Sequence, residues 1–259
     1  MKLFIDIGNQ RIKWQTSVSL TLPGTQSTQV WSYEGVVTVG GFKQRFASLP
    51  VPESVWVSCV SSDDVASCLR LACIELWQIE PVMVKSTSKA AGVVNGYYRS
   101  EQLGVDRWLA LIAAHHLVGN AHCVVVDAGT AVTVDGLLAN GEFTGGVIFP
   151  GIRTMQKSLN LQTEKITIQS PDEEEVKPTL CVQNRDTSSA VINGAKLAIS
   201  SGIESAIRRF SEAFGGDVSI FITGGDATRI LGLTATPMHF EPNLVMLGLS
   251  VLSSVDERH

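Results

Sequence analysis

The chain carries one turn motif twice, 121 positions apart from Asp6 to Asp127, and this duplication restricts the fold more than any other feature. The first copy reads KLFIDIGNQRIKW over residues 2–14, and the second reads CVVVDAGTAVTVD over residues 123–135. In each copy an apolar run leads to Asp, one further residue and Gly, and an alternating segment follows. This pattern predicts a strand, a tight turn and a second strand. Two such hairpins, about one small domain apart, indicate duplicated halves that hold a nucleotide between them.

Each turn combines a carboxylate with a glycine, and this combination suits a phosphate. Glycine adopts backbone dihedrals closed to other residues, so backbone N–H groups can approach a ligand closely. The N–H groups can hold phosphate oxygens while the Asp holds Mg²⁺ or its waters. In the first copy, the Lys13 ammonium in the return strand can meet the terminal phosphates. For one copy alone, the alternative is an ordinary hairpin whose Asp and Asn side chains serve only the turn.

Composition narrows the function classes. Of 259 residues, 44% are hydrophobic and 17% are charged, which argues against disorder and for a well-buried α/β protein. The net charge is −5 and no block of Lys or Arg occurs, so no electrostatic footprint for nucleic acid or an anionic membrane is present. No secretory or membrane-spanning apolar segment fits. Five cysteines without C-x-x-C spacing indicate reduced thiols in a cytoplasmic protein.

The pattern of elements places a domain boundary near the middle of the chain. Residues 101–118 form an expected helix, because apolar residues recur there at helical spacing up to Gly119-Asn120. We therefore expect domains at 1–118 and 119–259. In the second half we expect helices from about 152, over about 188–213 and over about 243–255. The acidic stretch at 170–180 is interpreted as a solvated loop.

Two further segments are candidate binding sites. The GVDR segment at 104–107 heads the first expected helix, where Asp106 and Arg107 suit a general base beside an anion-binding group. The alternative for Asp106 is a helix-dipole contact worth about 0.3–1 kcal/mol. Gly-Gly at 224–225 would let an adenine ring lie on the backbone, although a helix N-cap at Asp226 explains it nearly as well.

Several common types of site are excluded by motif. The histidines match no metal-ligand spacing, and no H-E-x-x-H occurs. The absence of G-x-S-x-G weakens a serine hydrolase interpretation. No Walker A lysine motif occurs, so any nucleotide site is not of the P-loop type.

Four motifs together resemble those of the type III pantothenate kinases, within the acetate kinase, sugar kinase, Hsp70 and actin superfamily. They are DIGNQRIK at 6–13, GVDR at 104–107, DAGTAVTVD at 127–135 and GGVIFPG at 145–151. NGYYRSEQLGVDRW at 95–108 also resembles the proteobacterial branch of that family. The resemblance implies an α/β fold of two ribonuclease-H-like (actin-like ATPase) domains with ATP in a central cleft. It implies ATP-dependent phosphorylation of pantothenate to 4′-phosphopantothenate, the first step of coenzyme A biosynthesis.

The resemblance also implies site residues. The ATP-binding residues would be Asp6, Ile7, Gly8, Asn9, Gln10, Arg11, Ile12, Lys13 and Thr130. The pantothenate-binding residues would be Tyr97, Gly104, Val105, Asp106, Arg107 and Thr187. Asp106 would accept the proton of the primary hydroxyl, Asp6 would direct Mg²⁺, and Asp127 would hold K⁺ or NH₄⁺ in members that need a monovalent cation. Tyr98 lies next to Tyr97 and leaves that assignment open.

The resemblance implies a homodimer as well. Trp108 is a candidate contact between the two chains or, equally, a core residue.

Two alternative functions are compatible with the same fold. One is a nucleotide-binding regulatory accessory factor, since fold does not fix function. The other is a kinase for a sugar or a short carboxylate. Against the first stand the complete catalytic set, Asp106 included, and the lack of a basic surface.

Overall fold

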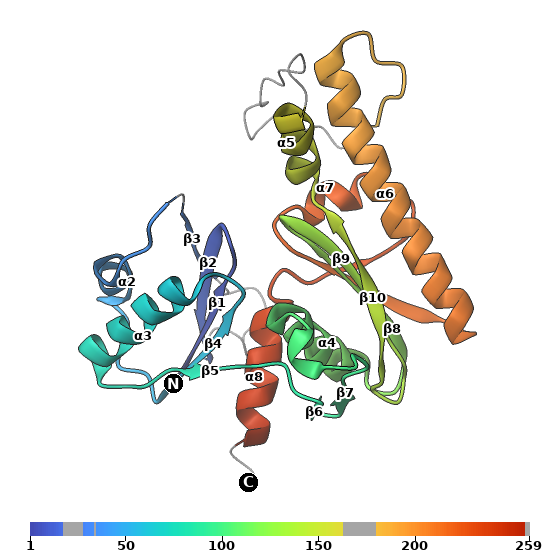
Figure 1. Cartoon of the computed structure of the whole chain (residues 1–259). Helices are drawn as coiled ribbons and strands as arrows, with labels where there is room; N and C mark the ends of the chain where they lie inside the picture. Colours follow the sequence, from blue (N-terminus) through green and yellow to red (C-terminus); the bar gives the residue numbers. More distant parts are fainter. Residues whose placement is uncertain (18–27, 34, 163–179, 257–259) are drawn as a thin grey trace. The chain divides into compact units, whose positions relative to one another are not determined.

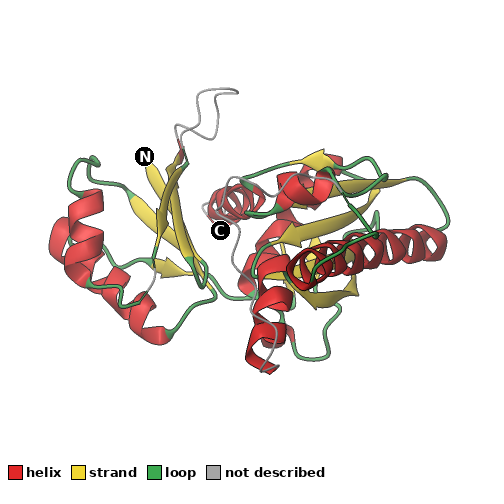
Figure 2. Ribbon diagram, turned by 90° about the horizontal axis from the view of Figure 1, so that it is seen from above, coloured by secondary structure: helices red, strands yellow, loops and turns green. Residues whose placement is uncertain are grey.

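The computed structural model of the protein describes residues 1–17, 28–33, 35–162 and 180–256. These residues form two compact units, the first made of Met1–His116 with Asn243–His259 and the second of Leu117–Pro242. Each unit contains a mixed five-stranded sheet with helices packed against it (Figures 1 and 2). Apart from residue 180, the expected solvated loop at 170–180 lies outside the described residues.

The elements of the first unit build a sheet with the order β3-β2-β1-β4-β5. Its strands are β1 (Lys2–Ile7), β2 (Arg11–Thr16), β3 (Gln29–Ser32), β4 (Ser54–Cys59) and β5 (Val82–Met83), and a separate hairpin pairs β6 (Lys89–Ala90) with β7 (Val93–Val94). Its helices are α2 (Val39–Phe46), α3 (Asp63–Trp77), the 3₁₀ turn η1 (Ser100–Gln102), α4 (Val105–Val118) and α8 (Leu244–Asp256).

The second unit repeats this plan with the sheet order β10-β9-β8-β11-β12. Its strands are β8 (His122–Ala128), β9 (Ala131–Leu137), β10 (Phe143–Pro150), β11 (Val218–Thr223) and β12 (His239–Phe240). Its helices are α5 (Ile152–Gln162), α6 (Thr187–Phe214) and α7 (Ala227–Leu231).

The two sheets have the same topology, which agrees with the duplication seen in the sequence. In the first, β1 is antiparallel to β2 and parallel to β4. In the second, β8 is antiparallel to β9 and parallel to β11. Asp6 and Asp127 therefore occupy corresponding places, each the next-to-last residue of the strand at the centre of its sheet.

Strand alternation sends the apolar residues of β1 to two different cores. Leu3, Ile5 and Ile7 join a cluster with residues of α2 and α3. Phe4 joins a second cluster with residues of β4, α4 and α8. The first sheet is thus covered by helices on both faces, with α2 and α3 on one face and α4 and α8 on the other (Figure 1).

Helix α8 changes the expected division of the chain. The sequence pattern assigned residues 119–259 to one domain, whereas the last helix groups with the first unit. Its apolar residues Val245, Met246 and Leu249 pack with Phe4 and Trp56. The pattern of strands and turns in the sequence cannot show that the C-terminal helix packs on the first unit. That packing depends on which face of the first sheet the other helices leave uncovered.

The core of the second unit lies between its sheet and the long helix α6. Val124 and Val126 of β8 pack there with Ile199 and Ile203 of α6 and Ile230 of α7. The five cysteines are free thiols, of which Cys73 and Cys123 are buried and Cys181 is exposed. Among the described residues, no helix is both long and apolar enough to cross a lipid bilayer.

Candidate active site

The first turn joins β1 to β2 over residues 8–10 and exposes backbone N–H groups. The Gly8 N–H closes the turn by donating to the Arg11 carbonyl oxygen at 2.9 Å. Asn9 and Gln10 are exposed, and within the described part of the chain their N–H groups make no backbone hydrogen bond. Exposed, unpaired N–H groups in a tight turn form an anion-binding concavity.

Asp6 stands beside this turn as a half-buried residue whose Oδ1 atom is inaccessible to solvent. It lies opposite Lys13 on β2 and opposite Ser58 on β4 in the strand register. Burial raises the pKa of Asp6 to about 6; the Lys13 charge opposes this shift and the Asp106 charge adds to it. Oδ1 of Asp6 and Oγ of Ser58 are both buried without a hydrogen-bond partner among the described residues.

These buried oxygens fit a cation with its shell of water. A buried polar atom without a partner is costly, and a hydrated ion would satisfy it. Among the described residues no group of three or more His, Cys, Asp or Glu side chains could hold a metal by itself. A single buried carboxylate fits Mg²⁺, which proteins bind through one or two carboxylates, substrate phosphates and waters.

Asp106 lies in the first turn of α4, in the same unit as Asp6. Burial raises the pKa of Asp106, while the Arg107 N–H and the Arg107 charge oppose the shift. The Arg107 N–H donates to Asp106 Oδ1 at 2.8 Å. A carboxyl group with a raised pKa is a stronger base than an ordinary aspartate, which suits proton abstraction from a hydroxyl.

Arg107 and Tyr97 form a contact beside this base. The Arg107 side chain is buried, and its Nη1 donates to the Tyr97 hydroxyl at 2.9 Å. Tyr97 is in turn placed by Asn95, whose Oδ1 accepts from the Tyr97 N–H at 3.0 Å. Tyr98 is fully exposed, so the structure brings Tyr97 rather than its neighbour to Arg107.

Gly104 leaves room for the Asp106 carboxylate. A Cβ atom at position 104 would lie 2.6 Å from Asp106 Oδ1, closer than real contacts allow.

Four other residues that the sequence analysis singled out have buried side chains: Ile7, Ile12, Val105 and Trp108. The first three can contact a ligand only through their backbone. Trp108 is fully buried in the core of its own chain, which leaves it no surface for a partner.

The second turn joins β8 to β9 and is closed by the Gly129 N–H, which donates to the Ala131 carbonyl oxygen at 2.9 Å. Thr130 is exposed at the tip of this turn. Asp127 pairs with Thr133 on β9 and with Thr223 on β11. Oγ1 of Thr133 is buried without a partner among the described residues, so this side of Asp127 offers a further oxygen to a cation.

Two glycines bring other segments of the second unit against this turn. The Gly151 N–H donates to the Thr130 carbonyl oxygen at 2.9 Å, and the Asp226 N–H donates to the Ala128 carbonyl oxygen at 2.9 Å. Cβ atoms at Gly151 and Gly224 would lie 2.2 Å from the Gly129 oxygen and 2.3 Å from the Ala128 oxygen. The Gly-Gly segment and the end of GGVIFPG therefore both meet the DAGT turn.

Gly151→Ala is expected to displace the second turn, because the clash involves backbone rather than a flexible side chain. Overpacking of this kind costs about 1–3 kcal/mol of the free energy of unfolding, which urea denaturation can measure. Gly216→Ala is the matched control, since a Cβ there has no neighbour within 4 Å. Equal stability of the two variants would show that the turn is not held at Gly151.

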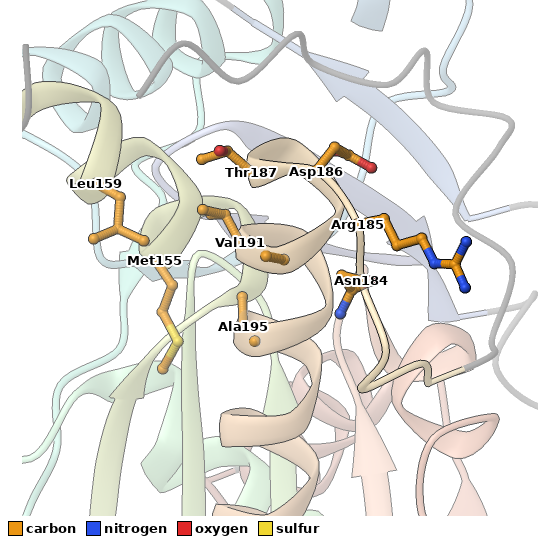
Figure 3. Close-up of a pocket in the computed structure, with 10 residues that line it drawn as sticks. Met155, Leu159, Asn184, Arg185, Asp186, Thr187, Val191 and Ala195 are labelled. Atoms are coloured by element: carbon orange, nitrogen blue, oxygen red, sulfur yellow. The ribbon is translucent and has the colours of Figure 1, made fainter. Parts of the chain in front are cut away.

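Thr187 begins α6 in the second unit and lines a pocket of about 730 Å³. Met155 and Leu159 of α5 and Val191 and Ala195 of α6 give this pocket an apolar side, while Arg185 points away from these side chains (Figure 3). The first unit thus gathers Asp6, Lys13, Tyr97, Asp106 and Arg107, and the second holds Asp127, Thr130 and Thr187.

Sequence reasoning missed Ser58, which lies opposite Asp6 in the strand register, and Asn95, which positions Tyr97. Asn95 donates through Nδ2 to the carbonyl oxygens of Thr87 and Ser100, both at 3.2 Å, and so ties together the segment that carries Tyr97. The NGYY segment contains Asn95, so a polar residue before the tyrosines was the available signal. No feature of the sequence indicated Ser58, because a serine in an apolar strand is common.

Solved structures share this fold at low sequence identity. A protein described as a Baf family transcriptional activator from Campylobacter jejuni matches with a TM-score of 0.60 and 17% identity, covering 99% of this chain and 100% of the other. The activator of 2-hydroxyisocaproyl-CoA dehydratase from Clostridium difficile, with bound ADPNP, matches with a TM-score of 0.53 and 12% identity, covering 99% and 96%. MreB 5 of Spiroplasma citri, bound to AMPPNP, matches with a TM-score of 0.51 and 10% identity, covering 99% and 97%. These likenesses confirm the expected actin-like ATPase fold with two sheet-containing domains.

Sequence relatives are considerably closer. A type III pantothenate kinase from Azoarcus sp. (strain BH72) is 34% identical over 99% of this chain and 92% of its own length. Another, from Burkholderia vietnamiensis (strain G4 / LMG 22486), is 32% identical over 97% of this chain and 96% of its own length. The profile of the family described as type III pantothenate kinase matches residues 2–209. Together with the site geometry in each unit, these matches lead to one conclusion: the chain belongs to the type III pantothenate kinase family.

Proposed function

We propose that this protein transfers the terminal phosphoryl group of ATP to the primary hydroxyl of pantothenate, with Asp106 as the proton acceptor and the two Asp-Gly turns as phosphate-binding loops. The observation that carries the proposal is the grouping of Asp106, Arg107 and Tyr97 in the unit that also holds Asp6. This grouping provides a base, a cation and a metal-directing carboxylate. Family membership supports pantothenate and ATP as the substrates.

In this mechanism the hydroxyl proton passes to Asp106 as the hydroxyl oxygen attacks the γ-phosphorus. The bond from the γ-phosphorus to the bridging oxygen breaks, and ADP leaves with that electron pair. Arg107 is suited to the pantothenate carboxylate, since it is buried and oriented by Tyr97. The N–H groups of Asn9 and Gln10 bind phosphate oxygens, and Lys13 offsets their charge. Mg²⁺ directed by Asp6 supplies further neutralisation of the phosphate charge when bound.

The proposal is tested by coupled ADP release with MgATP and a panel of acceptors. Pantothenate is expected to give turnover, whereas hexoses and short hydroxy acids are expected to leave only background ATP hydrolysis. A sugar used with higher kcat/KM than pantothenate would contradict the proposed acceptor.

A monovalent cation at Asp127 is part of the proposal. Thr133 supports it, because its buried hydroxyl oxygen has no partner among the described residues and lies on the strand facing Asp127. We expect the rate to be higher with K⁺ or NH₄⁺ than with Na⁺ at equal ionic strength, and Thr133→Val to remove that difference. Equal rates with K⁺, NH₄⁺ and Na⁺ would contradict the proposed monovalent cation at Asp127.

We also propose a homodimer, on the basis of the family resemblance. Light scattering coupled to gel filtration is expected to give twice the mass of one chain. A monomeric mass for active enzyme would contradict the dimer and leave the kinase assignment standing.

The regulatory alternative draws on the name of the Campylobacter jejuni protein, which at 17% identity shares the fold alone. A nucleotide-binding accessory factor has no need of a base with a raised pKa beside a buried arginine. MgATP binding without turnover of any acceptor would favour that alternative.

A further inference from the structure

Tyr33 directly follows β3 and reaches the first turn with both its side chain and its backbone. The Tyr33 hydroxyl donates to the Gly8 carbonyl oxygen at 2.6 Å. The Tyr33 N–H donates to the Gln10 carbonyl oxygen at 3.1 Å. One residue outside the DIGNQRIK motif therefore holds two of the carbonyl groups in the turn.

Ser61 supports Tyr33 from the segment after β4. The two hydroxyl oxygens lie 3.1 Å apart. A tyrosine hydroxyl has a single proton, and Tyr33 gives it to Gly8, so Ser61 is the donor in this contact. The hydrogen bonds then run in series from Ser61 through Tyr33 to Gly8, and each bond in such a chain polarises the next.

Because the peptide unit is planar, the hydrogen bond from Tyr33 to the Gly8 carbonyl oxygen also fixes the direction of the Asn9 N–H. The Gly8 carbonyl and the Asn9 N–H belong to one trans peptide unit, so they point in opposite directions. When Tyr33 holds the carbonyl on its side, the Asn9 N–H is aimed away from Tyr33. Asn9 is exposed, and among the described residues its N–H makes no backbone hydrogen bond.

The second turn is held in a similar way by a different residue. There the Thr154 hydroxyl donates to the Thr130 carbonyl oxygen, also at 2.6 Å. A hydroxyl from outside each motif thus binds a carbonyl of the turn. The two units share a topology but place these hydroxyls on unrelated elements, β3 and its continuation in one case and α5 in the other.

We propose that Tyr33, supported by Ser61, is a positioning residue that aims the Asn9 N–H at a phosphate oxygen of ATP. The inference rests on the proposed role of residues 8–10 as a phosphate loop. It adds a determinant of MgATP affinity that lies outside the DIGNQRIK motif. The effect acts on nucleotide binding and not on the acceptor, because the Asn9 N–H would contact the phosphates alone.

The test is Tyr33→Phe, which removes one hydroxyl and keeps the ring and the backbone N–H. The dissociation constant for MgATP by calorimetry and the KM for MgATP are expected to rise about fivefold to tenfold, equivalent to one net hydrogen bond. The kcat at saturating MgATP and the KM for pantothenate are expected to stay at wild-type values. A purely structural role would instead lower the active fraction, and with it kcat, and would leave the KM for MgATP unchanged.

Tyr98→Phe is the matched control, since the Tyr98 side chain is fully exposed. Ser61→Ala is expected to have a smaller effect, and the double variant with Tyr33→Phe should bind MgATP no more weakly than Tyr33→Phe alone. If the losses of MgATP affinity in the two single variants add up in the double variant, Ser61 does not act through Tyr33. Wild-type affinity in Tyr33→Phe would overturn the role of Tyr33 while leaving the kinase proposal intact.

Calorimetry separates this inference from the proposed function. If the wild type binds MgATP but phosphorylates no pantothenate, the proposed acceptor is wrong and the Tyr33 comparison still decides the inference. If the wild type does not bind MgATP, both proposals are overturned.

Discussion

Asp106→Asn is expected to lower kcat by about 10²–10⁴-fold while the fold is retained, the usual range for loss of a general base. The amide keeps the size of the carboxyl and can still accept the Arg107 N–H through its oxygen. It cannot take up the hydroxyl proton. The KM for MgATP should change little, because Asp106 does not belong to either phosphate-binding turn. Steady-state kinetics with both substrates varied provides the measurement.

Asp64→Asn is the matched control for this experiment. Asp64 lies in the first turn of α3 in the same unit, as Asp106 does in α4, and it is exposed. Both substitutions remove a carboxylate that acts on a helix dipole, an effect of about 0.3–1 kcal/mol on stability. Only Asp106→Asn should affect kcat. A near wild-type kcat in Asp106→Asn would limit Asp106 to the capping role that its contact with the Arg107 N–H also allows.

Asp6→Asn is expected to reduce kcat/KM for MgATP by at least about 10²-fold, comparable to the loss of one electrostatic stabiliser at an active site. The neutral amide would direct Mg²⁺ poorly, so a higher Mg²⁺ concentration should be needed for half-maximal rate. Titration of Mg²⁺ at fixed ATP provides the measurement. An unchanged Mg²⁺ dependence would remove Asp6 from metal binding.

The same substitution should stabilise the ligand-free protein at neutral pH. The pKa of Asp6 is about 6 in the folded chain against an ordinary value of 3.8, so the folded state favours the protonated carboxyl. The resulting penalty is absent below pH 3.8, grows as the pH rises towards 6, and then levels at about 3 kcal/mol. Asn carries no such penalty. The stability of Asp6→Asn relative to wild type should therefore increase from acidic pH to pH 6 and stay constant above it.

Denaturant melts of both proteins without Mg²⁺ or ATP, between pH 4.5 and 8, measure this difference. A difference independent of pH would mean that Asp6 titrates normally. The stability penalty and the expected loss of activity have one cause, because a carboxylate held in a buried position is destabilising until a cation binds there. In the wild type, kcat/KM for MgATP, which reports the ligand-free enzyme, should fall as the pH drops through about 6, since protonated Asp6 directs Mg²⁺ poorly.

Much of the fold was predictable because local signals mark the element ends. The strand, turn and strand expected over residues 2–14 are observed as β1 and β2, and the helix expected over about 188–213 is observed as Thr187–Phe214. Asp186 caps the start of that helix and Gly215 ends it in a left-handed conformation. Both signals are visible in the sequence.

Other elements were not predictable, because tertiary contacts decide them. Helix α2 contains two adjacent glycines, which disfavour helix, and it forms because Phe42 and Phe46 are buried on the first sheet. Strand β3 is a short edge strand of mostly exposed residues. Helix α4 was expected from 101 and begins at Val105, since a 3₁₀ turn and Gly104 precede it.

The residues of the candidate site also fall into those that local sequence marks and those that tertiary contacts decide. Asp6, Asp106 and Arg107 belong to motifs that the sequence displays. Burial raises the pKa of Asp6 and of Asp106, and Arg107 donates to the Tyr97 hydroxyl, while the roles of all three stay predictions. Tyr33 donates to the Gly8 carbonyl oxygen and Asn95 accepts from the Tyr97 N–H, so both residues hold parts of those motifs. Only Asn95 has a local signal, as a polar residue before the tyrosines, whereas the contact of Tyr33 with the first turn depends on strands β2 and β3, which become neighbours only in the folded chain.

The proposed kinase activity is tested most directly by the identity of the product that purified protein forms from MgATP and pantothenate, measured by mass spectrometry and ³¹P NMR. The expected product is pantothenate bearing one phosphate monoester on its primary hydroxyl, formed in a one-to-one ratio with ADP, and Asp106→Asn is expected to give no such product over the same time. Unmodified pantothenate after incubation with folded, MgATP-binding protein would contradict the kinase assignment itself.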